Sequence, residues 1–139
     1  MTFAIHVPGD PRPAGRPRFS GRRVHMPAAD IAAKELIQQH WMLAGQPRHK
    51  GLYAATVQVT VARPKSHWRK AGEELTAAGR GQLTPVGDVD NFAKLAIDAL
   101  VQCGAVDDDR YMVELRVWKL WAHRDAEAGL HIAITDTAF

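Results

Sequence analysis

Residues 88–109 read DVDNFAKLAIDALVQCGAVDDD, and this stretch decides the fold that we expect. Apolar residues recur at helical spacing over about Val89–Cys103, which predicts a helix that stops at Gly104. One side of this helix should pack on a sheet and carries Phe92, Ala96, Ala99 and Cys103. The opposite side carries a polar row with a spacing of four residues, Asp90, Lys94 and Asp98.

The same stretch concentrates acids at both ends of the predicted helix. Asp88 and Asp90 stand at its start, and Asp107-Asp108-Asp109 follow its end. Carboxylates packed this closely repel one another unless a positive charge lies between them, and Mg²⁺ and Mn²⁺ prefer such oxygen ligands. The alternatives are a helix N-cap for the first group and a polar turn for the second. Bringing the two groups together requires a tertiary turn, with the next strand running beside the helix start.

Alternating apolar residues and chain breakers predict the remaining elements. In residues 52–62, one face of the predicted strand carries Tyr53, Ala55, Val57, Val59 and Val61. In chain order we predict a strand at 3–7, a helix at 27–44, a strand at 52–62, a helix at 89–103, and strands at 111–121 and 130–135. The last two strands should form a hairpin. This β-α-β-α-β-β order favours one α+β domain over 1–139, a mixed sheet of about four strands with two main helices on one face.

Two basic loops interrupt this pattern. Residues 8–27 hold five prolines and should form an extended loop, whose arginines are Arg12, Arg16, Arg18, Arg22 and Arg23. Residues 63–87 have no clear period, and a loop of this length is usually functional or disordered. Residues 1–83 hold 13 Lys/Arg and 5 Asp/Glu, whereas 84–139 hold 5 and 10. This split is expected if one half grips phosphate and the other holds metal; the alternative is two solvated faces that help the halves dock.

Composition excludes several classes of protein. The 139 residues suffice for one compact domain, and no apolar run approaches the roughly 18 residues of a membrane span. The N-terminus lacks a signal-peptide pattern, and the single Cys103 excludes an internal disulfide, so we expect a reducing cytoplasm. The sequence has no glycine-rich phosphate-binding loop, so we expect no nucleotide cofactor. It also has no His/Cys spacing typical of a zinc site. An EF-hand register fails at Phe92 and Ala93.

Three motifs resemble those of the RusA-type Holliday junction resolvases. The most specific is Asp88-x-Asp90-Asn91-x-x-Lys94-x-x-x-Asp98-Ala99-Leu100, followed by Gly104 and by Asp108-Asp109. GRPRF at residues 15–19 and RPKSH at 63–67 are similar to two further segments of that family. The order of elements also agrees, so the resemblance covers nearly the whole chain.

The resemblance implies a homodimeric, Mg²⁺-dependent endodeoxyribonuclease, with Mn²⁺ as a substitute. Such an enzyme resolves four-way junction DNA by paired symmetric nicks in recombination and repair, and many members come from prophages. Position by position, Asp88, Asp90 and Asp109 match the metal-binding and catalytic aspartates, Lys94 matches the catalytic lysine, and Asp108 is an adjacent helper. The register within Asp107-Asp108-Asp109 stays open by one residue.

The basic loops predict contacts with DNA phosphates. The residues are Arg12, Arg16, Arg18, Arg22, Arg23, Lys65, Arg69 and Lys70. The alternative is a solvated basic surface. Phe19 is a candidate wedge at the junction centre, as are Trp68 and Tyr111. Ile97 and Val101 form a candidate dimer patch. Rival functions are a nuclease for other branched DNA and a non-catalytic DNA-binding protein of the same fold.

Overall fold

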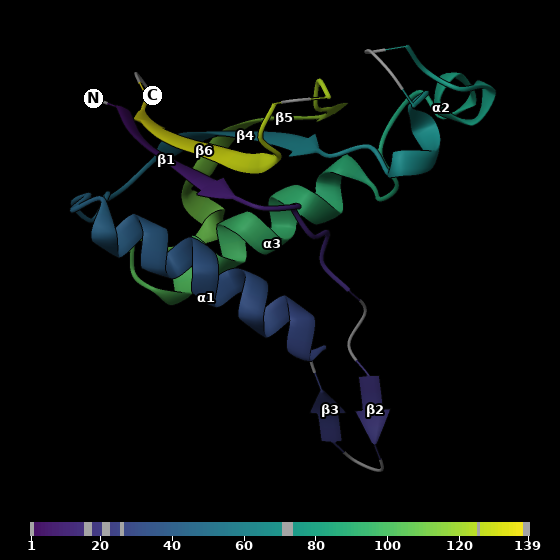
Figure 1. Ribbon diagram of the computed structural model, residues 1–139. Coiled ribbons are helices and arrows are strands. Elements are labelled where there is room, and N and C mark those ends of the chain that lie inside the picture. The colour runs from purple at the N-terminus through teal and green to yellow at the C-terminus, as the bar shows by residue number, and fades with distance from the viewer. Residues whose placement is uncertain are drawn as a thin grey trace.

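The computed structural model describes residues 2–15, 18–20, 23–25, 27–70, 74–124 and 126–137, and it shows a mixed sheet with two main helices beneath one face (Figure 1). The strands of this sheet lie in the order β1 (Thr2–Pro8), β6 (Gly129–Asp136), β4 (Tyr53–Val61) and β5 (Met112–Trp121). The two helices are α1 (Ala28–Leu43) and α3 (Val89–Gln102). The predicted α+β class is therefore confirmed. No helix in the described part of the chain has the length and apolar character to cross a membrane.

The predicted hairpin of the last two strands is wrong, because β4 lies between β5 and β6. Strand β4 pairs in parallel with β5 and antiparallel with β6, which in turn pairs antiparallel with β1. The inward side chains of β4 from Tyr53 to Val59 are almost completely buried. A strand this apolar is best covered by neighbours on both sides, whereas β5 carries the charged Glu114, Arg116 and Lys119 and takes the edge.

The core forms where the inward face of the sheet meets α3. Phe92, Ala96 and Ala99 are buried there, which confirms the predicted inner face of the helix. Ile97 is also buried, with only 3% of its surface exposed in the single chain. The predicted dimer patch at Ile97 and Val101 is therefore wrong, because Ile97 lies in a wall that it shares with Met112 and Leu115.

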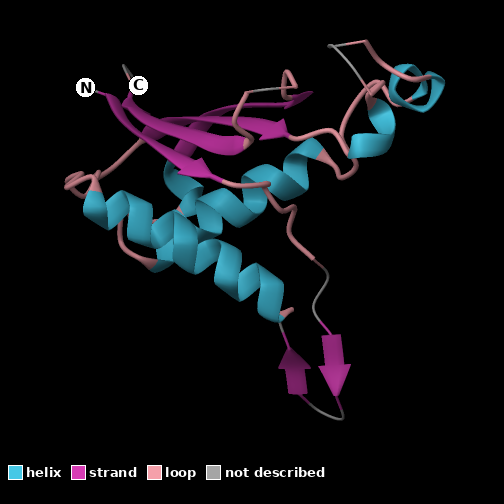
Figure 2. Ribbon diagram, in the orientation of Figure 1, coloured by secondary structure: helices cyan, strands magenta, loops and turns pink. Residues whose placement is uncertain are grey.

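Both basic loops contain secondary structure that their sequences did not predict. Residues 8–27 include the antiparallel pair β2 (Arg18–Ser20) and β3 (Arg23–His25), which projects away from the sheet and helices (Figure 1). Residues 63–87 include the 3₁₀ turn η1 (Lys65–His67) and the short helix α2 (Ala77–Gly81), visible in Figure 2. Elements of three to five residues show no usable period in a sequence.

Two glycines with positive φ define the ends of α3. Gly87, with φ +107°, turns the chain into the helix, and Gly104, with φ +78°, turns it out. Such angles suit glycine because it has no Cβ. The chain then passes through the 3₁₀ turn η2 (Asp109–Tyr111) and directly into β5. This path carries the second acidic group back toward α3.

Candidate active site

One pocket collects the polar row of α3 together with an acid from η2. Its polar lining consists of Asp90, Lys94, Asp98 and Asp109, and we call it the acidic pocket. The cavity measures about 210 Å³ and has apolar walls from α3 and β5. The expected tertiary turn is thus present, since Asp109 lies beside a helix that ended seven residues earlier, at Gln102.

Asp88 occupies the N-cap position of α3, but its side chain does not cap the helix. Its backbone carbonyl accepts hydrogen bonds from the N–H groups of Asn91 and Phe92 at 3.1 and 3.3 Å. The carboxylate accepts no capping hydrogen bond, and Asp88 is exposed. It is not among the residues that line the acidic pocket. The N-cap alternative therefore holds for the backbone of Asp88, but its carboxylate does not cap the helix.

The three consecutive aspartates have different partners. Asp107 accepts hydrogen bonds from Arg48 Nε and Nη2 at 2.9 and 2.5 Å. Asp108 accepts the backbone N–H of Arg110 at 3.0 Å and so caps η2. Only Asp109 of the three lines the acidic pocket. The polar-turn alternative thus fits Asp107 and Asp108.

Negative charge is concentrated around Asp109. The pKa of its carboxyl is raised, first by the hydrogen bond that it shares with Asp108, then by burial and by the charges of Asp108 and Asp98. Burial also raises the pKa of Tyr53 to about 12, with added contributions from the charges of Asp109 and Asp108. The Tyr53 hydroxyl donates to the backbone carbonyl of Asp108 at 3.2 Å. A cation placed here would relieve this repulsion.

Lys34 of α1 does not line the acidic pocket but forms an ion pair with one of its acids, Asp98. Its Nζ lies 3.9 Å from Oδ2 of Asp98, and its side chain is only 12% exposed. Asp98 belongs to the polar row that the sequence predicted, but it was not among the predicted site residues. No sequence signal links it to Lys34, because the two residues lie on different helices.

A buried acid fastens the start of the first basic loop to the helices. Asp30 of α1 is 1% exposed and accepts hydrogen bonds from Arg12 Nε at 2.6 Å and from the Gly15 N–H at 2.7 Å. The Ala14 N–H donates to the Asn91 carbonyl of α3 at 3.0 Å. Arg12 therefore has a structural role that its sequence context did not reveal. The loop begins beside the helix turn that carries Asp90.

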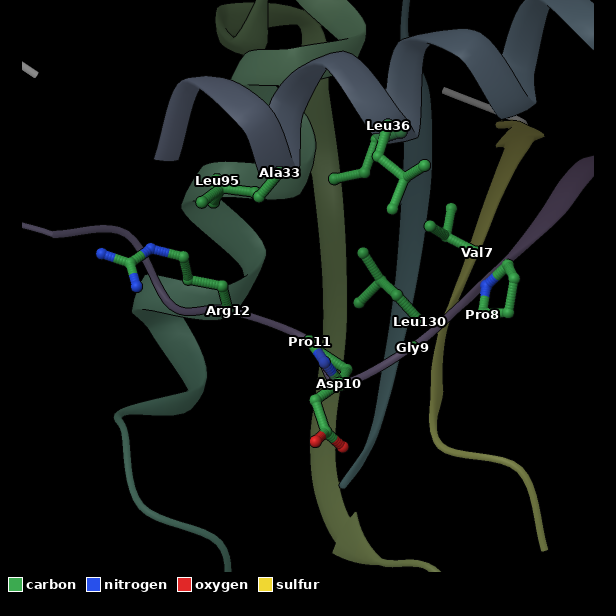
Figure 3. Close-up of a pocket in the computed structure, with 11 residues that line it drawn as sticks. Val7, Pro8, Gly9, Asp10, Pro11, Arg12, Ala33, Leu36, Leu95 and Leu130 are labelled. Carbon is green, nitrogen blue, oxygen red and sulfur yellow. The ribbon is translucent and has the colours of Figure 1, made fainter. Parts of the chain in front are cut away.

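A separate small pocket under this loop is apolar (Figure 3). Val7, Leu36 and Leu130 surround it, while the Arg12 side chain extends away from them. Its volume of about 40 Å³ leaves little more than a packing gap. Asp10 also points away from it, and its Oδ1 accepts the Ala62 N–H at 3.2 Å.

The other predicted DNA contacts fall into three groups. Arg16 and Arg22 lie outside the described residues. Arg18, Phe19 and Arg23 lie in β2 and β3, of which only the backbone is described. Lys65, Arg69 and Lys70 line a second pocket together with Arg63, Trp68 and Arg124, which we call the basic pocket.

Tyr111 is held by its neighbours. Its ring lies 5.1 Å from the Arg110 guanidinium, and its hydroxyl accepts a hydrogen bond from Arg110 Nη2 at 3.2 Å. It also packs against the hydrophobic core. These contacts account for Tyr111 as a residue that holds η2 in place.

The oxygen donors of the acidic pocket fit a hard divalent cation in kind. Asp90, Asp98 and Asp109 line one cavity. The pKa of Asp109 is raised first by its hydrogen bond with Asp108, then by burial and by the charges of Asp108 and Asp98. Among the described residues, no three acidic, His or Cys side chains are already gathered closely enough to form a metal-binding group. Metal binding would therefore require the carboxylates to draw together.

Comparison with known proteins identifies the family of this chain. The search of curated proteins returned no match. A family model described as endodeoxyribonuclease RusA matches residues 8–135. The matched region includes the acidic pocket, the basic pocket and the loop fastened by Asp30. The chain therefore belongs to the RusA family of endodeoxyribonucleases, which implies a Holliday junction endonuclease.

Proposed function

We propose that this protein is a Mg²⁺-dependent endonuclease that resolves four-way DNA junctions by paired symmetric nicks in recombination and repair. The supporting observation is the convergence of Asp90, Asp98 and Asp109 with Lys94 in one pocket. A basic loop is fastened one residue after Asp90, through the Asn91 carbonyl. A cation site beside a phosphate-binding loop is the arrangement that phosphodiester cleavage needs.

Asp88, Asp90 and Asp109 would hold Mg²⁺, with Mn²⁺ as a substitute and Asp108 as an adjacent helper. The metal would supply charge neutralisation at the phosphate and a more acidic water. Asp90 and Asp109 line the acidic pocket, and the Asp88 carboxylate accepts no capping bond. Lys34 and the α1–α3 packing would keep Asp98 in place behind them.

Lys94 would contact the scissile phosphate or orient the attacking water. It lies one helical turn after Asp90 on the same side of α3, and it is exposed toward the pocket. A fixed ammonium group stabilises the negative charge that develops on the phosphate oxygens. The expected products are a 5′-phosphate and a 3′-hydroxyl, which leave a ligatable nick.

DNA would be gripped by the basic loops. The residues of the first loop are Arg12, Arg16, Arg18, Arg22 and Arg23, with Phe19 as the candidate wedge, and those of the second are Lys65, Arg69 and Lys70. Clustered Lys and Arg bind phosphates and make affinity strongly dependent on salt. The Asp30 clasp supports this role, because it fixes the base of the first loop. We expect this binding to take place in the cytoplasm.

A homodimer would place two active sites on one junction. A four-way junction has pseudo-two-fold symmetry, and two symmetric nicks require two related sites. The contact surface between the subunits has to lie elsewhere than at Ile97, which the chain itself buries.

The decisive experiment incubates the protein with a labelled four-way junction, with and without Mg²⁺. Linear duplex and flap DNA serve as substrate controls, and Asp90→Asn serves as the site variant. We expect symmetric, Mg²⁺-dependent nicks on the junction alone, and the variant should bind the junction without cutting it.

Each other outcome has a definite meaning. Preferential cleavage of flaps would favour a nuclease for other branched DNA. Junction binding without cleavage in Mg²⁺ or Mn²⁺ would favour the non-catalytic alternative. Loss of both binding and cleavage in Asp90→Asn would contradict its assignment as a metal ligand.

A further inference from the structure

The parallel pairing of β4 with β5 brings two distant segments together at one end of the sheet. Both strands run the same way, so residues 62–70 after β4 and residues 122–124 after β5 leave side by side. The Ala122 N–H donates to the Val61 carbonyl at 2.8 Å and holds the two exits together. Figure 1 shows the segment that carries α2 at this end, well away from the β2–β3 hairpin.

This end of the molecule is held by side-chain contacts around Trp121. The Arg63 guanidinium lies 4.9 Å from the Trp121 ring and donates to the Gly79 carbonyl at 2.8 Å. The His67 ring is buried edge-on against Trp121, at 5.4 Å. Trp121 Nε1 in turn donates to the Gln82 carbonyl at 2.9 Å. These bonds join η1, α2 and β5 into one framework.

The basic pocket opens on this framework. It is lined by Arg63, Lys65, Trp68, Arg69, Lys70 and Arg124, and its volume is about 470 Å³. Every lining residue except Trp68 is cationic. Arg124 lies 5.6 Å from the half-buried Trp68 ring, and Glu74 offsets one charge through Arg69 at 3.8 Å. A concave surface with this excess of positive charge attracts a polyanion.

The acidic pocket and a cavity that adjoins the basic pocket are lined by side chains from the same face of β5. Leu115 lines the acidic pocket and Trp121 lines the cavity adjoining the basic pocket, and both occupy the positions of β5 that pair with inward residues of β4. Six residues of strand separate them, a distance of about 20 Å. A DNA helix passing both pockets would cover about six base pairs in that distance.

A second connection joins the two pockets through the chain before α3. Lys119 Nζ donates to the Pro85 carbonyl at 2.7 Å and also to the Gly87 carbonyl. Residues 82–87 therefore run from the framework around Trp121 to the turn that presents Asp88. A DNA phosphate held in the basic pocket would therefore fix which phosphate of the same DNA reaches the acidic pocket.

We propose that the basic pocket binds the sugar–phosphate backbone of one duplex arm, about six base pairs from the cleaved phosphate. Lys65 and Lys70 contact phosphate oxygens, and the Trp68 ring packs against the sugar. This role rests on the proposed junction cleavage, but it concerns binding at a site separate from the chemistry. The pocket sets affinity for long arms and leaves the chemical step unchanged.

The test measures affinity for junctions whose arms have about 4, 8 and 12 base pairs, lengths that bracket the predicted contact. Hairpin loops close the arms so that the short ones stay paired, and EDTA prevents cleavage. The double variant Lys65→Gln/Lys70→Gln is compared with the wild type. Lys50→Gln is the matched control, because it removes an exposed lysine at the opposite end of β4.

Wild-type affinity should rise between the shortest and middle arms, and the double variant should lose this rise. Its salt slope on long-armed junctions should fall by about one for each lysine removed. With Mg²⁺, KM should rise on long-armed junctions while kcat stays the same. Hydroxyl-radical footprinting should show wild-type protection about six base pairs from the cleaved phosphate, absent in the variant.

Equal loss of affinity on all arm lengths, or no loss, would overturn the arm contact. Trp68→Leu supplies an independent variant, and retained arm-length dependence there would remove the tryptophan from the proposal. Failure of the proposed function can be distinguished from failure of the arm contact. In that case the wild type would show no preference for junctions over duplex at any arm length. A circular dichroism melt confirms that each variant is folded before it is compared.

Discussion

The carboxylates of Asp107, Asp108 and Asp109 are consecutive, yet their surroundings differ. Arg48 holds the pKa of Asp107 below its ordinary value through a hydrogen bond, and Asp108 caps η2. Asp109 shares a hydrogen bond with Asp108, and it alone of the three lines the acidic pocket with Asp98 and Asp90. The sequence could not decide among the three, because the choice depends on Arg48, a residue far away in the chain.

Asp109→Asn should therefore reduce cleavage far more than Asp107→Asn. We expect the first variant to lose more activity than the roughly 10–100-fold that outer-shell partners of a metal cost. The second loses only an ion pair with Arg48, and Asp107 does not line the acidic pocket. Single-turnover cleavage of a junction in Mg²⁺ measures both. Equal losses would return the register of the acidic run to an open question.

Substitution of Asp30 should mainly lower the stability of the folded protein. Asp30→Asn removes charge-assisted hydrogen bonds to Arg12 and Gly15 and should lower the free energy of unfolding by about 1–3 kcal/mol at pH 7. Glu35→Gln removes an exposed acid from the same helix and should stay within about 0.5 kcal/mol of the wild type. Urea denaturation measures both, and equal losses would deny Asp30 its role as a clasp.

The contribution of Asp30 should also depend on pH. Burial alone would raise its pKa, but the hydrogen bonds from Arg12 and Gly15 and the charges of Arg12 and Lys34 hold it below 3.8. A lowered native pKa gives stability that is present above the unfolded pKa and lost as pH falls through the native one. The difference between wild type and Asp30→Asn should therefore shrink below about pH 4. A constant difference down to pH 2 would contradict this account.

At the scale of elements, α3 depends on the glycine that precedes it. A Cβ at Gly87 would lie 2.9 Å from Phe92 Cε2 and 3.1 Å from Pro13 Cγ, and φ there is +107°. Gly87→Ala should cost about 1–3 kcal/mol for the backbone conformation, with the clash added, and should displace Asp88. Its effects on both unfolding and cleavage should be large.

Gly104→Ala is the matched control at the other end of the helix. Gly104 also has positive φ, but a Cβ there would meet no atom within 4 Å. We expect a smaller loss of stability and no loss of cleavage activity. Thermal melts and cleavage assays on both variants separate backbone strain from the position of Asp88. Equal activity in the two would argue against the turn at Gly87 as a determinant of the site.

The sequence predicted the elements that have strong periodicity and missed those that depend on distant contacts. The inner faces of β4 and α3 follow directly from the spacing of Tyr53 to Val59 and of Phe92 to Ala99. The position of β4 between β5 and β6 could not be predicted locally, because neighbours in sequence usually pair. In the same way, the spacing within α3 predicted Asp90, Lys94 and Asp98 as one row. The ion pair of Asp98 with Lys34 was missed, because it joins two different helices.

At the scale of the whole molecule, the proposed homodimer makes the two nicks separable. If each subunit cuts one strand, mixing the wild type with excess Asp90→Asn should convert paired nicks into single nicks. Denaturing gels of a junction labelled on both cut strands measure this. Persistence of paired nicks in mixed dimers would mean that one subunit makes both cuts. Sedimentation equilibrium at micromolar concentration should find a dimer, and a monomer would contradict the proposal.

The position of β6 between β1 and β4 has a consequence for how the chain acquires this fold. Thr2 and Thr135 meet across β1 and β6, although they are 133 positions apart in the sequence. Pairing between such distant segments slows folding, because the chain loses the entropy of loop closure before the stabilising contacts form. During synthesis the acids of the acidic pocket leave the ribosome before β6 exists. Until residues 129–136 emerge, β1 lacks its partner in the sheet, so a nascent chain carries the acids of the acidic pocket before the sheet beside them is complete.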